Sequence, residues 1–166
     1  MNIVLLEPEI PPNTGNVARL GAGLGLAIHL VGPLGFSLDD RHLKRAGLDY
    51  WPLVDLRLWP DLGAFLMDGP RGRLVATSAR EGEHFSRYWP EPSDNLLFGP
   101  ESRGLPREAL DLADQVLSVP LRPGVRSLNL ATTVGFFMGL ALSRLGTGKY
   151  PASSPGAATG PQFRDD

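Results

Sequence analysis

Residues 96–106 read Leu96-Leu97-Phe98-Gly99-Pro100-Glu101-Ser102-Arg103-Gly104-Leu105-Pro106. The apolar run at 96–98 is short and is followed by turn residues, which is typical of a buried strand. The last proline is at a favoured first position of a helix. The stretch therefore predicts a strand, a polar loop and a helix in succession, which is the unit from which α/β folds are built.

The same unit recurs along the chain. Further buried strands are expected at residues 3–6, 28–31, 74–77 and 116–119, and helices at 14–24, 39–46, 61–67, 107–112 and 127–145. This alternation predicts an α/β fold with a mainly parallel sheet and helices on both faces. A chain of 166 residues is long enough for one domain. We expect that domain at residues 1–146 and a flexible tail, rich in Gly, Ser, Ala and Pro, at residues 147–166.

Two more polar stretches lie at the edges of apolar elements. One runs from Pro12-Asn13-Thr14-Gly15-Asn16 to Arg19, and the other is Arg126-Ser127-Leu128-Asn129-Leu130, which opens the last helix. An α/β fold gathers the loops at the carboxyl ends of its strands, where ligands bind. The three polar stretches together therefore predict a single site.

The first polar stretch has two explanations. Asn13 is a good cap for the helix beside it. A cap alone does not call for Asn16 and Arg19, which lie three residues apart on one helix face and suit an anionic or hydroxyl substrate. The spacing alone supports capping and substrate binding equally.

The loop at 99–104 lacks the spacing of the dinucleotide fingerprint and the Gly-Lys-Ser/Thr ending of a Walker loop. It could be a plain turn in which Glu101 and Arg103 form a solvated pair. Its glycines would also let the backbone approach a flat, nearly neutral ligand such as an adenosine.

The third polar stretch also has two explanations. Ser127 could cap the last helix. Arg126, in contrast, suits a phosphate or carboxylate, and Asn129, in the first helical turn, offers a hydrogen-bond donor and an acceptor.

Composition excludes several kinds of chemistry. The chain has no cysteine, which rules out disulfides, thiolate metal sites and cysteine nucleophiles. The three histidines are scattered without metal-ligand spacing, so we expect no metal, and His29 inside a strand is interpreted as a satisfied core residue. The sequence has no G-x-S-x-G elbow of a serine hydrolase.

The net charge and the N-terminal sequence limit which partners and which cellular location we expect. A net charge of −2 argues against a generic polyanion binder, so nucleic acid would need a local basic patch. Candidates are the run Arg41-His42-Leu43-Lys44-Arg45 and the pair Arg122 and Arg126. The N-terminus lacks the pattern of a signal peptide, and we expect a cytoplasmic protein.

The last expected helix is apolar on every side. Leu130, Val134 and Phe137 form one stripe, while Phe136 and Met138 extend the apolar surface to the other side. A helix that is apolar all round is buried all round. The helix is too short and carries too many polar residues, such as Thr132 and Thr133, to span a membrane, and we expect no membrane contact. Because a single small domain would struggle to bury such a helix, we expect a homodimer that uses this face.

The three motifs together resemble the SPOUT superfamily of RNA methyltransferases, and especially its small tRNA 2′-O-methyltransferases of the TrmL type, which act on the wobble nucleotide. The matching motifs are Asn13-Thr14-Gly15-Asn16-Val17-Ala18-Arg19, Gly99-Pro100-Glu101-Ser102-Arg103-Gly104 and Ser127-Leu128-Asn129-Leu130. Stretches 7–12 and 45–51 also resemble this subgroup. The resemblance covers residues 1–145, and three motifs in the right order and at the right intervals are highly specific.

The resemblance implies a C-terminal trefoil knot in which S-adenosylmethionine binds in a bent form. It also implies a homodimer in which the methyl donor of one chain lies near residues of the other. The donor-binding positions that it implies are Thr77, Gly99, Glu101, Val119, Pro120, Ser127 and Leu128.

The implied reaction is attack of a ribose 2′-hydroxyl on a sulfonium methyl group, which needs alignment and removal of a proton. The resemblance assigns activation of the hydroxyl to Arg19. Because a guanidinium stays protonated, we expect Arg19 to hold the phosphate and stabilise alkoxide charge, with the proton leaving to the phosphate, to water or to Glu101. Asn129 completes the candidate catalytic set, and Asn16 and Asn129 would orient the ribose or the loops. The residues expected to contact the tRNA are Asn16, Arg41, Lys44, Arg45 and Arg126.

Three alternatives stay open. A related methyltransferase could act at another position of tRNA or on rRNA, although such relatives usually carry an extra RNA-binding domain. A non-catalytic RNA- or nucleotide-binding homologue would bind the donor without transferring its methyl group. A flavodoxin-like protein would bind flavin instead, and that reading leaves the stretch Arg126-Ser127-Leu128-Asn129 unexplained.

Overall fold

The computed structural model describes residues 1–38 and 50–146, and their centre is one sheet in which every described strand pair is parallel. Its seven strands are β1 (Asn2–Leu6), β2 (Ala27–Val31), β3 (Leu56–Trp59), β4 (Leu74–Ser78), β5 (Glu83–His84), β6 (Asn95–Phe98) and β7 (Gln115–Ser118), in the order β3-β2-β1-β6-β4-β7-β5. The helices are α1 (Pro11–Leu24), α3 (Leu62–Asp68), α4 (Arg107–Asp111) and α5 (Leu130–Leu145), with 3-10 turns η1 (Trp51–Leu53) and η2 (Phe85–Arg87).

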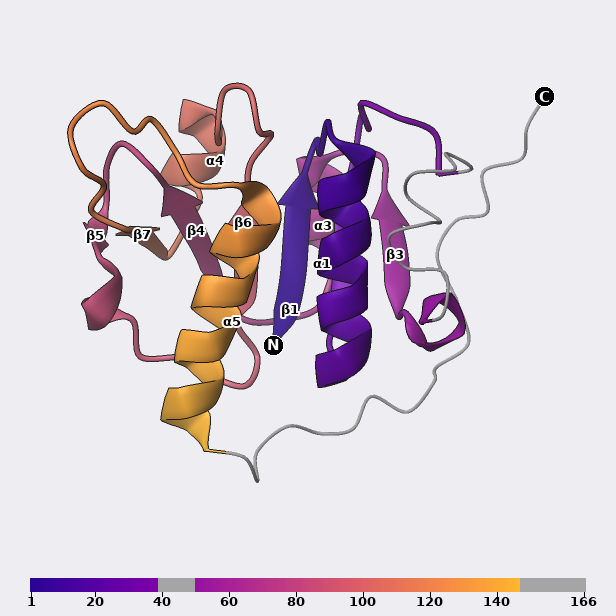
Figure 1. The fold of residues 1–166 in the computed structure, drawn as a ribbon. Helices are drawn as coiled ribbons and strands as arrows, with labels where there is room; N and C mark the ends of the chain where they lie inside the picture. Colours follow the sequence, from indigo (N-terminus) through magenta and orange to yellow (C-terminus); the bar gives the residue numbers. More distant parts are fainter. Residues whose placement is uncertain (39–49, 147–166) are drawn as a thin grey trace.

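Helices cover both faces of the sheet (Figure 1). On one face, α1 and α5 lie side by side and bury Val17, Val134 and Phe137 against inward-facing residues of the strands. On the other face, α3 and α4 bury Phe65 and Ala109 against the alternate residues of the same strands. The predicted parallel sheet with helices on both faces is confirmed, whereas the trefoil knot stays a prediction. Within the described residues, no helix is long and apolar enough to cross a membrane.

Several boundaries differ from those expected. Helix α1 begins at Pro11 rather than at residue 14, because a proline needs no N–H partner in the first turn. Strands β3 and β5 were not predicted, since β3 carries Arg57 in its middle at the sheet edge and β5 is only two residues long. The helix expected at 39–46 lies outside the described residues.

The strand order reverses beside β1. From β1 the chain moves outward through β2 and β3, then crosses to β4 and returns to place β6 next to β1. Loops that follow neighbouring strands diverge at such a point and leave a crevice at the carboxyl ends of the strands. We call this end of the sheet the carboxyl edge.

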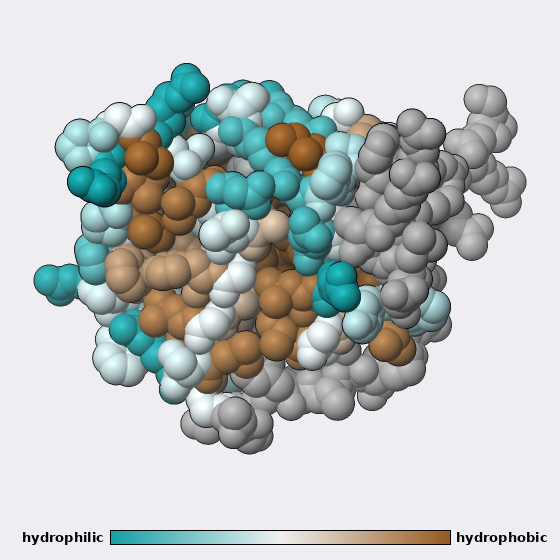
Figure 2. Space-filling view, viewed as in Figure 1, coloured by the Kyte–Doolittle hydropathy of each residue, from teal (hydrophilic) through white to brown (hydrophobic). Residues whose placement is uncertain are grey.

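Part of α5 stays exposed although the helix packs on the sheet. Met138, which we expected on a second apolar face, is buried within its own chain. The Phe136 side chain is 38% exposed, and Figure 2 shows apolar surface on the face that carries α5 and α1. At the far end of the helix, Arg144 donates hydrogen bonds to the backbone carbonyls of Ser86 and Tyr88.

Candidate active site

A pocket of about 830 Å³ opens at the carboxyl edge, between the loops that follow β4, β6 and β7. Its lining combines the apolar side chains of Phe98, Leu130 and Phe137 with polar loop residues. A volume of this size is within the range of small-molecule sites. The sequence-predicted residues that line it are Thr77, Gly99, Glu101, Val119, Arg126, Ser127 and Leu128. The predicted residues outside the lining, among those that the structure describes, are Asn16, Arg19, Pro120 and Asn129.

Three side chains from the three polar stretches form one hydrogen-bonded chain beside this pocket. The Asn13 amide nitrogen donates to Oε1 of Glu101 at 3.0 Å, and the Asn129 amide nitrogen donates to Oδ1 of Asn13 at 2.8 Å. Asn13 is buried, with 7% of its surface exposed, so its polar groups need these partners. The stretches that are far apart in sequence are therefore joined directly.

The local structure around these hydrogen bonds differs from three expectations. Asn13 lies inside α1 and makes no cap, because the helix begins before it at Pro11. Asn129 is the cap of α5 rather than a residue of its first turn, and its side chain accepts a hydrogen bond from the Thr132 N–H at 3.2 Å. Ser127, which could have been the cap, lies in the loop before the helix.

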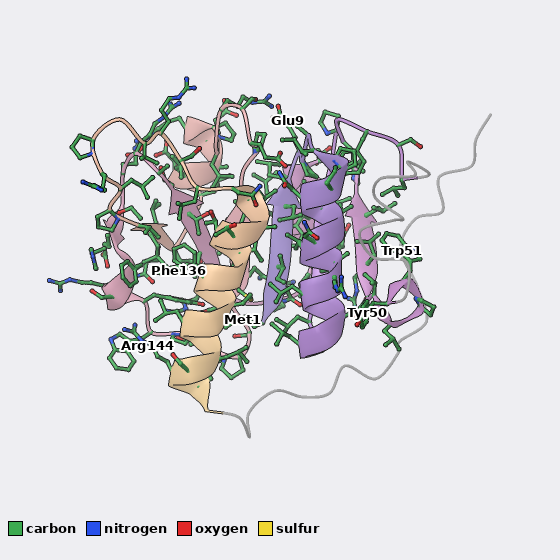
Figure 3. All side chains as sticks on the ribbon, in the orientation of Figure 1. Met1, Glu9, Tyr50, Trp51, Phe136 and Arg144 are labelled. Carbon is green, nitrogen blue, oxygen red and sulfur yellow. The ribbon has the colours of Figure 1, made fainter. Side chains whose placement is uncertain are left out.

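The β1–α1 loop and the 99–104 loop are also joined to each other. The Glu9 N–H donates to Oε2 of Glu101 at 2.9 Å, and in return Ser102 donates its N–H and hydroxyl to the Glu9 carboxylate at 2.8 and 2.7 Å. The hydrogen bonds from Ser102, followed by the charge of Arg103, lower the pKa of Glu9. Figure 3 shows Glu9 at the carboxyl edge, at the opposite end of the sheet from Met1 and Arg144.

Arg103 is therefore not paired with Glu101, as a simple solvated pair would require. It forms ion pairs with Glu7 and Glu9 across the two loops. Glu101 instead accepts hydrogen bonds at both carboxylate oxygens. The carboxylates of Glu7 and Glu9, in the stretch after the first strand, are the sequence signal for this contact, which was not predicted.

Position 99 has room only for glycine. A Cβ atom at this position would lie 2.4 Å from the backbone nitrogen of Leu105, so the loop closes on itself where only a hydrogen atom fits. Gly104 adopts a φ of 74°, in the left-handed region that glycine enters without strain. The close approach at Gly99 is thus required within the protein itself, and its expected approach to a ligand stays a prediction.

The two polar residues on the outer face of α1 lie apart from the pocket of their own chain. Asn16 and Arg19 are exposed, and the Arg19 guanidinium lies 4.7 Å from the centroid of the Tyr50 ring. An arginine can stack on an aromatic ring and still present its N–H groups to a ligand. Arg41, Lys44 and Arg45, the other predicted RNA contacts, lie outside the described residues.

His29 is buried on the opposite face of the sheet from α1 and α5. Its Nδ1 accepts a hydrogen bond from Trp59 Nε1 at 2.9 Å, and its ring also contacts Phe65. Its Nε2 has no hydrogen-bond partner in the described part of the chain, so the core residue that we expected to be satisfied is only half satisfied. Burial, followed by the charge of Arg57, lowers the pKa of His29 to about 4.

Comparison with known proteins identifies the family of this chain. Residues 1–139 match the SpoU rRNA Methylase family. The chain belongs to this family. Within the SpoU rRNA Methylase family, it is 44% identical over 148 residues to a protein of Aeromonas hydrophila named tRNA (cytidine(34)-2'-O)-methyltransferase, and the alignment covers 88% of this chain and 95% of that protein.

Solved structures agree with this placement. One structure described as addressing the 2-OH methylation of C/U34 on tRNA is 52% identical, with a TM-score of 0.83, and covers 87% of this chain and 95% of its own. The SpoU methyltransferase AviRb of Streptomyces viridochromogenes, solved in complex with the cofactor AdoMet, shares the fold at 21% identity, with a TM-score of 0.74 over 87% of this chain and 60% of its own. These comparisons confirm the resemblance that the three motifs indicated.

Proposed function

We propose that this protein is an S-adenosylmethionine-dependent tRNA methyltransferase that methylates the 2′-hydroxyl of the wobble nucleotide, cytidine or uridine 34. The observation that carries the proposal is the hydrogen-bonded chain from Glu101 through Asn13 to Asn129, because it gathers the three motif stretches around one pocket. The names of its SpoU relatives favour nucleotide 34 over other RNA positions. We further propose a domain at residues 1–146 and action in the cytoplasm, where tRNA is used.

The pocket suits the methyl donor, which carries an adenosine, a sulfonium and an amino acid. Its apolar side chains Phe98, Leu130 and Phe137 can cover a flat base, while backbone groups around Gly99, Val119 and Leu128 can hydrogen-bond its edges. When bound, the donor supplies an electrophilic methyl group. We assign Thr77, Ser127 and the remaining predicted donor residue, Pro120, to the rim of the same site.

Glu101 has the contacts of a positioning residue. Both of its oxygens accept hydrogen bonds from the protein, one from Glu9 and one from Asn13, so in this arrangement it fixes the loops that shape the pocket. Asn129 extends the same network to the start of α5. The proton of the 2′-hydroxyl then leaves to the phosphate or to water.

Arg19 is proposed to act on the substrate of the partner chain. It lies outside the pocket of its own chain, on the exposed face of α1, a helix that packs beside α5. A homodimer that covers Phe136 of α5 would bring this face toward a second pocket. There the guanidinium would hold the phosphate and stabilise the alkoxide as it forms.

The test is methyl transfer from labelled S-adenosylmethionine to total tRNA, with the modified nucleotide located by mass spectrometry. We expect a 2′-O-methyl group at nucleotide 34. Transfer to another tRNA position or to rRNA would refute the assigned substrate. Donor binding without transfer to any RNA would favour a non-catalytic homologue, and absence of donor binding would overturn the methyltransferase assignment.

A further inference from the structure

Four arginines line the pocket at the carboxyl edge, and they fall into two groups. Arg103 is paired with Glu7 and Glu9. Arg107 is paired with Glu81 at 3.1 Å and with Asp111 at 2.8 Å, and these carboxylates raise its pKa. A cation whose charge is already balanced by the protein gains little from a phosphate.

The other two, Arg80 and Arg126, have neither an ion pair nor a side-chain hydrogen bond within residues 1–38 and 50–146. Both are exposed. The acidic side chains closest to Arg80 in sequence are engaged elsewhere, since Glu81 pairs with Arg107 and Glu83 accepts a hydrogen bond from Gln115. Arg80 and Arg126 therefore carry the unbalanced positive charge of the pocket lining.

The backbone that carries Arg80 is fixed at the rim of the pocket. The hydroxyl of Ser78 accepts hydrogen bonds from the N–H groups of Arg80 and Glu81, at 3.2 and 3.4 Å. Two residues later, Gly82 has a φ of 120°, and a Cβ there would lie 2.8 Å from the carbonyl oxygen of Val116 in β7. The loop after β4 is thus fixed against its neighbouring strand, and Arg80 projects from a rigid support.

Arg126 approaches the same pocket from the neighbouring strand. Strands β4 and β7 pair in parallel, with Ser78 opposite Ser118, so the loops that carry the two arginines leave the sheet at the same end. Each contributes one arginine to the lining. Two unpaired guanidinium groups on adjacent loops can contact successive phosphates of one RNA strand.

We propose that Arg80 is an RNA-binding residue that acts with Arg126 to hold the phosphate backbone on either side of the target nucleotide, while Arg103 and Arg107 serve the protein alone. The inference rests on the proposed function and adds a residue that neither the motifs nor the charge runs of the sequence indicated. It also explains how a chain of net charge −2 binds RNA. RNA affinity depends on the local positive charge of Arg80 and Arg126, which no carboxylate within the described residues neutralises, and not on the net charge of the whole chain.

The test compares Arg80→Ala with the wild type for binding of a tRNA anticodon stem-loop by fluorescence anisotropy at several salt concentrations. Donor affinity is measured separately by calorimetry. We expect Arg80→Ala to weaken RNA binding about tenfold and to reduce the slope of log K against log salt by about 0.7. Arg126→Ala should behave alike, and the donor affinity should stay within a factor of two.

The matched control is Arg71→Ala, an exposed arginine without an ion pair in the described ranges, at the other end of the sheet before β4. It should bind RNA like the wild type. Unchanged RNA affinity and salt slope for Arg80→Ala would overturn the inference, and so would a change confined to donor affinity, because the arginine would then serve the carboxylate of the donor. Since binding is measured directly, a wild type that binds RNA without methylating it would refute the proposed function and leave this comparison decisive.

Discussion

Asn13 and Glu101 are 88 positions apart in sequence, and the Asn13 side chain donates a hydrogen bond to the Glu101 carboxylate at 3.0 Å. The same amide accepts one from Asn129 at 2.8 Å. Asn13 is thus the middle member of a chain that begins in the loop after β6 and ends at the cap of α5. Replacing it would leave polar groups on both sides without a partner.

We predict that Asn13→Ala lowers the free energy of unfolding by about 1–3 kcal/mol, because two part-buried hydrogen bonds, to the Glu101 carboxylate and from the Asn129 amide, are lost. The pocket should loosen as well, so donor affinity should fall together with stability. Urea denaturation and calorimetric titration of S-adenosylmethionine measure the two effects. Asn16→Ala, on the exposed face of the same helix, is the control and should leave both quantities unchanged. Equal stability of the two variants would contradict a structural role for Asn13.

We predict that His29 makes the protein less stable in mild acid. Its pKa is about 4 in the folded state, below the ordinary value near 6.5, so the unfolded chain binds more protons between these values. Its contribution is complete above pH 6.5 and is lost as the pH falls toward 4, by about 3 kcal/mol in all. In His29→Phe, urea denaturation from pH 7.5 to 4.5 should show a correspondingly shallower decline.

The pH dependence, rather than the absolute stability, decides this prediction, because His29→Phe also removes the acceptor of the Trp59 N–H. Carboxylates titrate equally in both proteins and cancel in the comparison. His84→Gln removes an exposed histidine and controls for a change at the surface. Parallel curves for His29→Phe and the wild type would show that His29 can be charged within the fold.

We predict that Arg19→Ala abolishes methyl transfer while donor affinity is retained. The reason is that Arg19 lies outside the donor pocket of its own chain but presents a cation on α1. The expected loss in kcat is at least about a hundredfold, typical of removing a group that stabilises developing charge. Single-turnover transfer to tRNA and calorimetric donor binding measure the two effects, and near wild-type rates would show that the assignment is wrong.

Arg19→Lys separates charge from geometry in the same assay. Lysine keeps the positive charge but loses the planar fork of N–H donors, so we expect partial activity. The melting temperature of each variant is measured in parallel, because loss of the contact with Tyr50 could also destabilise the chain. A variant that is inactive only in proportion to unfolding would argue for a structural role.

We predict that Phe136→Glu converts a dimer into monomers. The ring is 38% exposed on α5 and lies against Phe85, and a carboxylate there would be desolvated by a second chain. Sedimentation velocity measures the mass. Leu112→Glu, which places the same charge at a 57% exposed apolar residue after α4 on the opposite face, should remain dimeric. A wild type that is monomeric at all concentrations would refute the proposed dimer.

The central strands and the helices on both faces could be predicted because runs such as residues 3–6 are apolar without interruption, which a strand buried on both faces requires. The edge strand β3 escaped prediction because Arg57 interrupts its apolar pattern, and the two-residue β5 is too short to have a pattern. Edges of a sheet tolerate polar residues, and a sequence pattern marks them weakly.

The candidate site was predictable in its location but not in its contacts. Motif order placed Glu101, Asn129 and the first turn of α1 at one edge of the sheet. The partners of Asn13 and Arg103 follow only from how loops after distant strands meet, and local propensity suggested a cap and a solvated pair instead. The separation of Arg80 from Arg107 likewise depends on which carboxylates lie within reach.

The hydrogen bond between Asn13 and Asn129 spans 116 positions, and this span has a consequence for biosynthesis. During translation, α1 and most of the sheet emerge from the ribosome before the residue that completes the network is joined to the chain. A nascent polypeptide in which Asn129 has not yet left the ribosome therefore lacks the hydrogen bond that completes the network beside the pocket.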